Sequence, residues 1–404
     1  MSEPTVADDT DPAPDEQVLE VAEFFAGIGL ARLGLESAGF RVTWANDIEQ
    51  AKQEMYVSQF GESAKAEYRL EDIAEVKGSE LPERLSLAWA SFPCTDLSLA
   101  GKRSGLAGKH SGTFWQLTRI LKELDTRPAV VALENVNGFA TSHKGEDLKV
   151  AISTLNQLDY SVDVMTIDAR RFVPQSRPRL FVVAVQQDLV REATAAGLPL
   201  RSTSSGPGLV QETASSLRPA WLDKFFADDD LETHHFDLPP LRNPLEAGFS
   251  GLVEDLDTKD DRWWDAKRMS AFTKELSKVQ KDRLDELRKT ADEPIYRTAY
   301  RRTRNGVPAW EVRADDIAGC LRTARGGSSK QAVVRIQRGR TLRARWLTPL
   351  EYARLMGAGE YELSDARKNQ ALFGFGDAVC VPVVEWLGKE YLRPIAEIAA
   401  NRTL

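Results

Sequence analysis

Short apolar runs alternate with helical patterns over the first 186 residues. Strands are predicted at residues 18–25, 40–45, 85–90, 129–133 and 180–185. Helical patterns lie between them, for example at 114–124 and 148–158. Strands that alternate with helices predict an α/β fold, with a doubly wound, mainly parallel sheet covered by helices on both faces.

This alternation stops near residue 186 and a helical pattern returns near residue 348. The chain is therefore divided into a disordered acidic tail (1–16), a first domain (17–186), a second domain (187–342) and a return to the first domain (343–404). The second domain is predicted to be irregular, because it mixes Pro-, Ser- and Asp-rich loops with aromatic pairs and one amphipathic stretch at 269–287.

Charge is unevenly distributed along the 404 residues. The formal net charge is -8, but residues 1–20 alone hold seven acids and no Lys or Arg. Residues 297–345 carry 13 Lys and Arg against three acids. Such a block suits phosphate binding. It equally suits a solvated face, or ion pairs with the acidic stretch 223–237, and charge alone leaves these alternatives open.

Three cysteines are too few and too scattered for a disulfide framework or a Cys-based zinc site, so no metal is expected. The N-terminus has no secretory signal pattern, and no apolar run is long enough to span a membrane. We therefore expect a cytoplasmic protein that is not bound to a membrane and is a monomer.

A glycine turn follows the first predicted strand, at Phe-Ala-Gly-Ile-Gly (residues 25–29). Glycines let a ligand approach the backbone, and the next helix offers free N–H groups. Asp47 lies about 20 residues later, where a ribose-binding acid is expected, and Asp72 could reach an adenine amino group. Arg32 replaces the third glycine of a dinucleotide pattern, so a plain turn in an ordinary α/β protein is the alternative.

Chemistry-bearing residues cluster beside three strands. Cys94 follows the strand at 85–90, which places it at the carboxyl edge of the sheet, where such folds bind ligands. A lone cysteine is more often an inert core residue. Glu134 ends the strand at 129–133, as a catalytic acid or as a helix cap. Arg177 and Arg179 precede the strand at 180–185, either as anion-binding groups or as surface arginines.

The order of these motifs resembles the cytosine-5 DNA methyltransferase family of the bacterial restriction–modification type. Residues 345–357 and 373–379 resemble its ninth and tenth motifs, so the resemblance covers 18–186 and about 343–392. It implies a Rossmann-like fold that depends on S-adenosylmethionine as the cofactor, double-stranded DNA as the partner, and 187–342 as the target-recognition domain. Residues 317–327 resemble its glycine-containing recognition loop.

The resemblance also implies residue roles. Cys94 would attack a flipped cytosine, Glu134 would bind the base, and Arg179 and Arg177 would assist. The implied cofactor residues are Phe25, Ala26, Gly27, Gly29, Asp47, Asp72, Ile73, Pro93, Asp377, Ala378 and Val379. The implied DNA contacts are Ser98, Arg103, Arg322, Arg325, Gly326 and Gly327.

Two positions depart from the family pattern: Thr95 stands where Gln is usual, and Asp377 where Asn is usual. We expect Asp377→Asn to keep activity. Three alternatives share the fold: a catalytically silent DNA-binding relative, an RNA methyltransferase and a small-molecule methyltransferase. The length of 187–342 favours duplex DNA over the last two.

Overall fold

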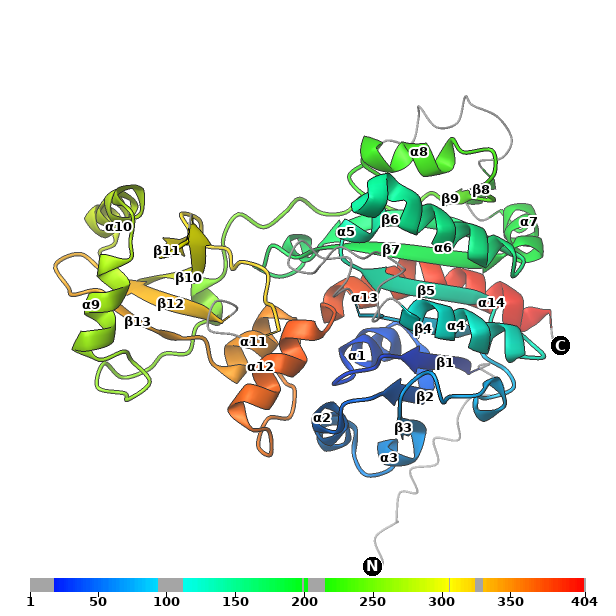
Figure 1. Ribbon diagram of the computed structural model, residues 1–404, viewed down its shortest axis with the longest axis horizontal. Helices are drawn as coiled ribbons and strands as arrows, with labels where there is room; N and C mark the ends of the chain where they lie inside the picture. Colours follow the sequence, from blue (N-terminus) through cyan, green and yellow to red (C-terminus); the bar gives the residue numbers. More distant parts are fainter. Residues whose placement is uncertain are drawn as a thin grey trace, which may run out of the picture.

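A seven-stranded sheet forms the centre of the larger part of the molecule (Figure 1). The computed structural model describes residues 18–93, 112–197, 200–202, 215–304, 306–323 and 330–402. The strand order is β3-β2-β1-β4-β5-β7-β6. The strands are β1 Leu19–Phe24, β2 Phe40–Asp47, β3 Tyr68–Leu70, β4 Leu87–Ala90, β5 Val130–Asn135, β6 Tyr160–Asp168 and β7 Pro178–Gln186.

One strand of this sheet runs against the others. β1, β2, β3, β4 and β5 pair in parallel, whereas β7 is antiparallel to both β5 and β6. Every residue of β4 and β5 is buried, as expected for parallel strands covered on both faces. The doubly wound, mainly parallel fold predicted from the sequence is confirmed.

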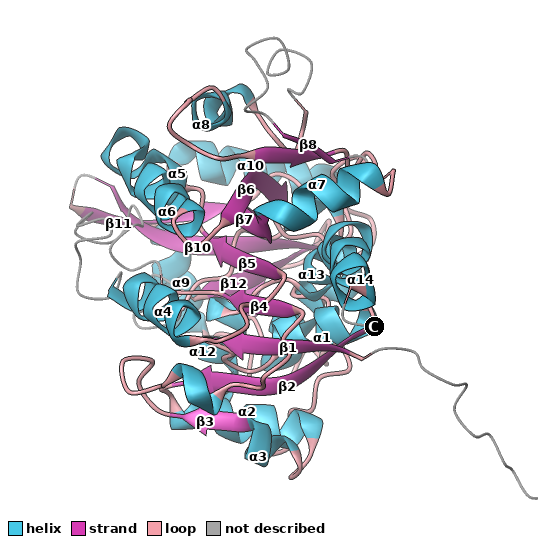
Figure 2. Ribbon diagram, turned by 90° about the vertical axis from the view of Figure 1, so that its right-hand side faces the viewer, coloured by secondary structure: helices cyan, strands magenta, loops and turns pink. Residues whose placement is uncertain are grey.

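Helices cover both faces of the sheet (Figure 2). Apolar residues of α4 (Gly112–Glu123) and α6 (Glu146–Asn156) form the core on one face. The other face is covered by helices from the beginning, the middle and the end of the chain. These are α1 Leu30–Ser37, α2 Gln50–Phe60, α7 Gln187–Ala195, α13 Val381–Leu387 and α14 Arg393–Asn401. The shorter α3 (Ala64–Glu67) and α5 (Gly138–Thr141) lie in the connections.

The second unit contains an ordered sheet where the sequence predicted irregular structure. Its antiparallel strands follow the order β11-β10-β12-β13, with α9 (Ala266–Lys274) and α10 (Lys278–Thr290) packed beside them. The strands are β10 Ile295–Arg304, β11 Val307–Val312, β12 Gln331–Ile336 and β13 Arg343–Trp346. A cluster of aromatic rings, Trp264, Phe272, Trp310 and Trp346, fills the space between these elements.

Residues 187–197, 200–202 and 215–236 lie on the first sheet rather than in the second unit. Phe225 and Phe226 of α8 (Asp223–Phe226) join the same core as α4 and α6. Arg218 forms a buried ion pair with Asp163 of β6. The small sheet of β8 (Leu200–Ser202) and β9 (His234–Phe236) lies beside β6. The boundary predicted at residue 187 therefore precedes the observed one, because this segment contributes apolar side chains to the first core.

The chain returns to the first unit through α11 (Pro349–Leu355) and α12 (Lys368–Asp377). In α11, Thr348 and Glu351 form a capping box and Pro349 occupies the first turn, which together favour a helix start. The helical stretch Lys368–Asn401 is long and apolar enough to cross a membrane by length and composition alone, but 67% of its most apolar window is buried in the protein core.

Candidate active site

The ends of β4 and β5 lie side by side at the carboxyl edge of the sheet. Ala90 pairs with Leu133, and the Asn135 side-chain amide donates a hydrogen bond of 3.2 Å to the Phe92 carbonyl. Glu134, only 6% exposed, therefore lies close to the segment that leads through Pro93 to Cys94. Cys94 itself lies outside the described residues, and Pro93 is exposed.

Arg179 reaches this edge because β7 is reversed. In a parallel strand, its first residues would lie at the opposite edge of the sheet. Here Glu134 pairs with Phe181 in the antiparallel ladder, so Arg179 is near the end of β5. Its Nε lies 2.9 Å from Glu134 Oε1, with both side chains largely buried. The arrangement gives a carboxyl group held by a cation, close to the described segment 91–93 that precedes the predicted nucleophile.

Arg177 points elsewhere. Its guanidinium is 2% exposed and donates to the carbonyls of Leu321 (2.8 Å), Gly376 (3.3 Å) and Ala378 (2.5 Å). Burial and the neighbouring Arg179 lower its pKa. The side chain therefore joins the predicted recognition loop to the tenth motif, and it does so mainly through backbone carbonyls rather than through Glu134.

Cys320 lies in contact with both arginines, although the sequence gave no signal for it beyond its place in the recognition loop. Its Sγ is 3.4 Å from Arg177 Nη1 and 3.9 Å from Arg179 Nη1. Burial alone would raise the pKa of the thiol, but Arg177 and Arg179 outweigh burial and the net pKa is lowered. Arg179 thus contacts both Glu134 and a polarised thiol.

The glycine turn and Asp47 form one hydrogen-bonded unit. Phe25, Gly27 and Gly29 all have positive φ (57°, 59° and 79°), a conformation that favours glycine at the last two positions. The Gly27 N–H donates to Asp47 Oδ2 at 3.0 Å, and the Glu49 N–H donates to Oδ1 at 2.9 Å. Burial raises the pKa of Asp47, opposed by Lys52 and these N–H groups.

The other predicted cofactor residues surround this turn to different degrees. Asp72 is exposed and accepts a hydrogen bond from the Ala74 N–H (3.0 Å), while Ile73 is 4% exposed and packs in the core. Ala26 and Val379 are buried, and the Ala378 carbonyl is held by Arg177. Ile48 follows Asp47 and is 62% exposed, an apolar side chain that the sequence analysis missed.

These residues fit the chemistry of S-adenosylmethionine. At Gly27 an added Cβ would meet no atom nearer than Lys52 Cδ at 3.9 Å, so a ligand can approach the backbone there, and a carboxylate at the strand end can accept ribose hydroxyl hydrogens. The exposed Ile48 offers an apolar surface for a flat ring. Among the described residues, no group of three or more His, Cys, Asp or Glu side chains has metal-binding geometry.

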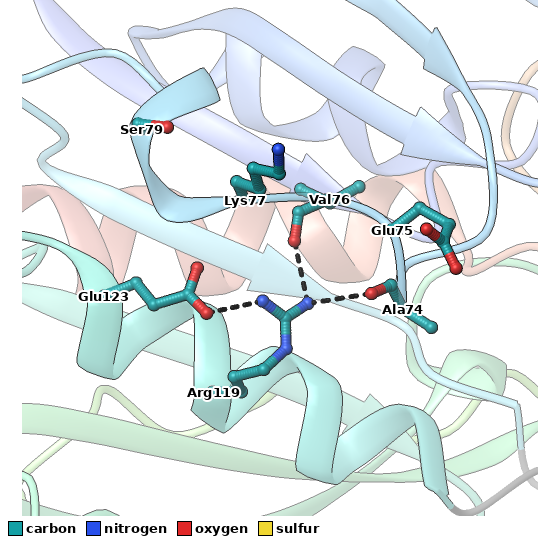
Figure 3. A pocket seen from close by; sticks show the side chains of 7 residues that line it. All are labelled: Ala74, Glu75, Val76, Lys77, Ser79, Arg119 and Glu123. Atoms are coloured by element: carbon teal, nitrogen blue, oxygen red, sulfur yellow. Dashed lines mark hydrogen bonds and ion pairs between the residues drawn. The ribbon is translucent and has the colours of Figure 1, made fainter.

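A pocket on the outer side of this region is lined by residues 74–77, Ser79 and two residues of α4 (Figure 3). Arg119 donates to the Val76 carbonyl at 2.7 Å and pairs with Glu123 at 2.6 Å. Glu123 also accepts from the Gly78 N–H. None of the residues that line this pocket is a predicted site residue. The contacts of Arg119 and Glu123 attach the loop that follows Asp72 to α4.

The predicted DNA contacts lie mostly outside the described residues. This applies to Ser98, Arg103, Arg325, Gly326 and Gly327, while Arg322 is described and exposed. Several arginines of the basic block form ion pairs within the second unit or at its border. The pairs are Arg297–Asp316, Arg301–Glu275, Arg313–Asp315 and the fully buried Arg345–Glu351. Part of the block therefore stabilises the fold.

The fold is shared with solved methyltransferases. Dnmt2 from S. pombe aligns over 93% of this chain and 99% of its own (TM-score 0.57, 16% identity). The Entamoeba histolytica methyltransferase EhMeth aligns over 95% and 99% (TM-score 0.58, 14% identity). At these identities the likeness establishes the fold.

The chain belongs to the C-5 cytosine-specific DNA methylase family, whose family model matches residues 19–393. The type II methyltransferase M.HhaI of Haemophilus parahaemolyticus is 34% identical over 172 residues, covering 42% of this chain and 50% of that protein. M1.ScrFI of Lactococcus lactis subsp. cremoris is 24% identical over 377 residues, covering 92% and 78%. The chain spans about half the length of most of the curated relatives it matches. The family resemblance and its methyl donor, S-adenosylmethionine, are thereby confirmed.

Proposed function

We propose that this protein transfers a methyl group to carbon 5 of cytosine within a specific sequence of duplex DNA. The observation that carries the proposal is the Glu134–Arg179 ion pair, with 2.9 Å between Nε and Oε1. It lies at the same sheet edge as the glycine turn and next to the segment that leads to Cys94. A base inside a duplex is inaccessible, so the cytosine flips into this site.

Cys94 supplies the nucleophile. Its thiolate adds to carbon 6 of the cytosine, because carbon 5 becomes nucleophilic only when the ring's aromaticity is broken. Glu134 accepts a hydrogen bond from the 4-amino group and shares a proton with N3, and this proton neutralises the negative charge that develops on the ring during thiolate attack. Arg179 holds the Glu134 carboxyl group in place, and its burial keeps that contact strong.

S-adenosylmethionine supplies an electrophilic methyl group when bound. Gly27, Gly29 and Asp47 hold it, with Asp47 oriented by the Gly27 N–H. Once carbon 5 carries the methyl group, it gives up its proton to solvent. The electron pair of that C–H bond re-forms the ring double bond, the bond between carbon 6 and sulfur breaks, and Cys94 leaves as the thiolate. Residues 98–115, most of which lie outside the described residues, are proposed to close over the base.

The test measures transfer of a tritiated methyl group from S-adenosylmethionine to unmethylated genomic DNA and to tRNA. Labelling of DNA that Cys94→Ser abolishes supports the proposal, as does a covalent complex of the wild-type protein with 5-fluorocytosine DNA. Labelling of tRNA alone identifies an RNA methyltransferase. DNA binding without any labelling identifies a silent relative. Bisulfite sequencing of the modified DNA then gives the recognition sequence.

A further inference from the structure

Lys52 occupies an unusual place in the first turn of α2, where the helix dipole disfavours a cation. Three carboxylates surround its ammonium group. Nζ lies 3.3 Å from Glu49 Oε1, 3.6 Å from Asp377 Oδ2 and 3.8 Å from Asp47 Oδ2. Burial lowers the pKa of Lys52, but the carboxylates outweigh burial and raise it overall. Lys52 therefore stays charged and joins acids from two parts of the chain.

On one side of Lys52 lies the glycine turn. Asp47 accepts the Gly27 N–H, and the Lys52 side chain passes over Gly27, where a Cβ would lie 3.9 Å from Lys52 Cδ. On the other side, Asp377 accepts a hydrogen bond from the Thr323 hydroxyl. Polar contacts thus run without a break from the glycine turn to Thr323.

Thr323 and Asp377 belong to one closely packed body. A Cβ at Gly376 would lie only 2.6 Å from the Arg322 carbonyl oxygen, and Arg177 bonds the carbonyls of Leu321, Gly376 and Ala378 together. Residues 321–323 and 376–378 therefore move together. Lys52 is the charged contact between this body and the glycine turn.

We propose that Lys52 is a positioning residue that couples the methyl-donor pocket to the recognition segment 320–323. The inference rests on the proposed function. A donor bound against Asp47 fixes that carboxylate, which fixes Lys52, Asp377 and Thr323 in turn. Asparagine at 377 would keep an acceptor for Thr323 but lose the charge that holds Lys52, which explains an acid at this position. Linkage is reciprocal, so an ordered recognition segment also favours the donor.

Hydrogen exchange of the full chain, with and without saturating S-adenosylhomocysteine, tests the coupling. In the wild-type protein the ligand is expected to slow exchange at residues 26–29 and, by at least about threefold, at 317–323. Lys52→Met should bind the ligand within about tenfold of wild type and lose the protection at 317–323. Lys52→Arg should restore it.

Arg367→Met is the matched control. Arg367 and Glu54 form another ion pair between the N-terminus of α12 and α2, at 3.7 Å, but both side chains are exposed and do not contact the glycine turn. This variant should behave as wild type. Asp377→Asn, which keeps the acceptor and removes the charge, provides the second variant and should lose protection at 317–323 as Lys52→Met does.

The outcomes separate the two proposals. Protection at 317–323 that persists in Lys52→Met or Asp377→Asn overturns the coupling, as does an equal loss in Arg367→Met. A wild-type protein that fails to bind S-adenosylhomocysteine overturns the proposed function instead. Ligand protection confined to 26–29 in the wild-type protein also overturns the coupling and leaves the function standing.

Discussion

Replacing Arg177 with methionine should destabilise the protein more than it impairs the chemical step. The guanidinium satisfies three carbonyls, of Leu321, Gly376 and Ala378. Each buried acceptor left without a donor costs about 1–3 kcal/mol. Removing a buried cation whose Nε has no partner among the described residues offsets part of this loss. The free energy of unfolding should therefore fall by about 3 kcal/mol or more.

The comparison is with Arg179→Met, two residues further along the chain and within β7. Arg179 holds Glu134 and also donates to the carbonyl of the neighbouring Pro178, but it does not join distant segments of backbone as Arg177 does. Its loss should therefore lower turnover by about a hundredfold or more with a smaller loss of stability. The stability assay is denaturant unfolding followed by tryptophan fluorescence. Turnover is measured as single-turnover methylation at a temperature where both variants are folded, and Arg177→Met should keep it within about tenfold of wild type.

One result would refute this reasoning. If Arg177→Met unfolds within about 1 kcal/mol of wild type and loses as much turnover as Arg179→Met, Arg177 acts on the substrate. The side chain would then play the catalytic role that its motif implies, and the contacts to the three carbonyls would be incidental.

Three other predictions follow from buried groups. Glu134→Gln should lower single-turnover methylation by about 10²- to 10⁴-fold while DNA binding in gel shifts is kept. Burial raises the pKa of Glu23 to about 8 from an ordinary 4.5, so the folded state holds the proton more tightly than the unfolded state does. As the pH rises between these two values, the free energy of unfolding therefore falls by up to about 1.4 kcal/mol per pH unit. Glu23→Gln should remove that slope in urea titrations at pH 5.5 and 7.5, and an unchanged slope would contradict the assignment. In Cys94→Ser protein, iodoacetamide should label Cys320 at least about tenfold faster than Cys380. The reason is that the pKa of Cys320 is lowered, whereas burial raises the pKa of Cys380 to about 12. Equal labelling rates of the two cysteines in peptide mass spectrometry would contradict this prediction.

The strands of the first sheet could be predicted because buried parallel strands are nearly continuous apolar runs. In β5 (VVALEN) the penultimate residue, Glu134, is the acid that the sequence analysis chose. Two of the seven strands of this sheet escaped prediction. β3 has only three residues, and β6 (YSVDVMTID) mixes polar with apolar positions instead of forming a continuous apolar run. The sheet of the second unit was missed because strands such as β10 (IYRTAYRRTR) carry arginines that obscure the alternation of apolar and polar positions.

Part of the candidate site depends on contacts that local sequence does not encode. Arg177 and Arg179 stand two residues apart in the same motif, yet one holds carbonyls at residues 321–378 and the other holds Glu134. The different contacts of Arg177 and Arg179 depend on the antiparallel direction of β7 and on the packing of the tenth motif against Arg177. Lys52 belongs to no recognised motif, and local sequence could not indicate its role because its partner Asp377 is 325 positions away.

The glycine turn is completed by residues from the far end of the chain. The Tyr361 hydroxyl donates to the Ile28 carbonyl at 2.7 Å, and a Cβ at Gly34 would lie 2.7 Å from Val384 Cβ. During synthesis, the packing of β1 and α1 therefore becomes complete only after about 350 further residues have been added, since Gly34 of α1 packs on Val384. Such long-range closure slows folding and leaves apolar surface exposed in the nascent protein. It also ensures that no partly synthesised chain assembles a complete donor pocket.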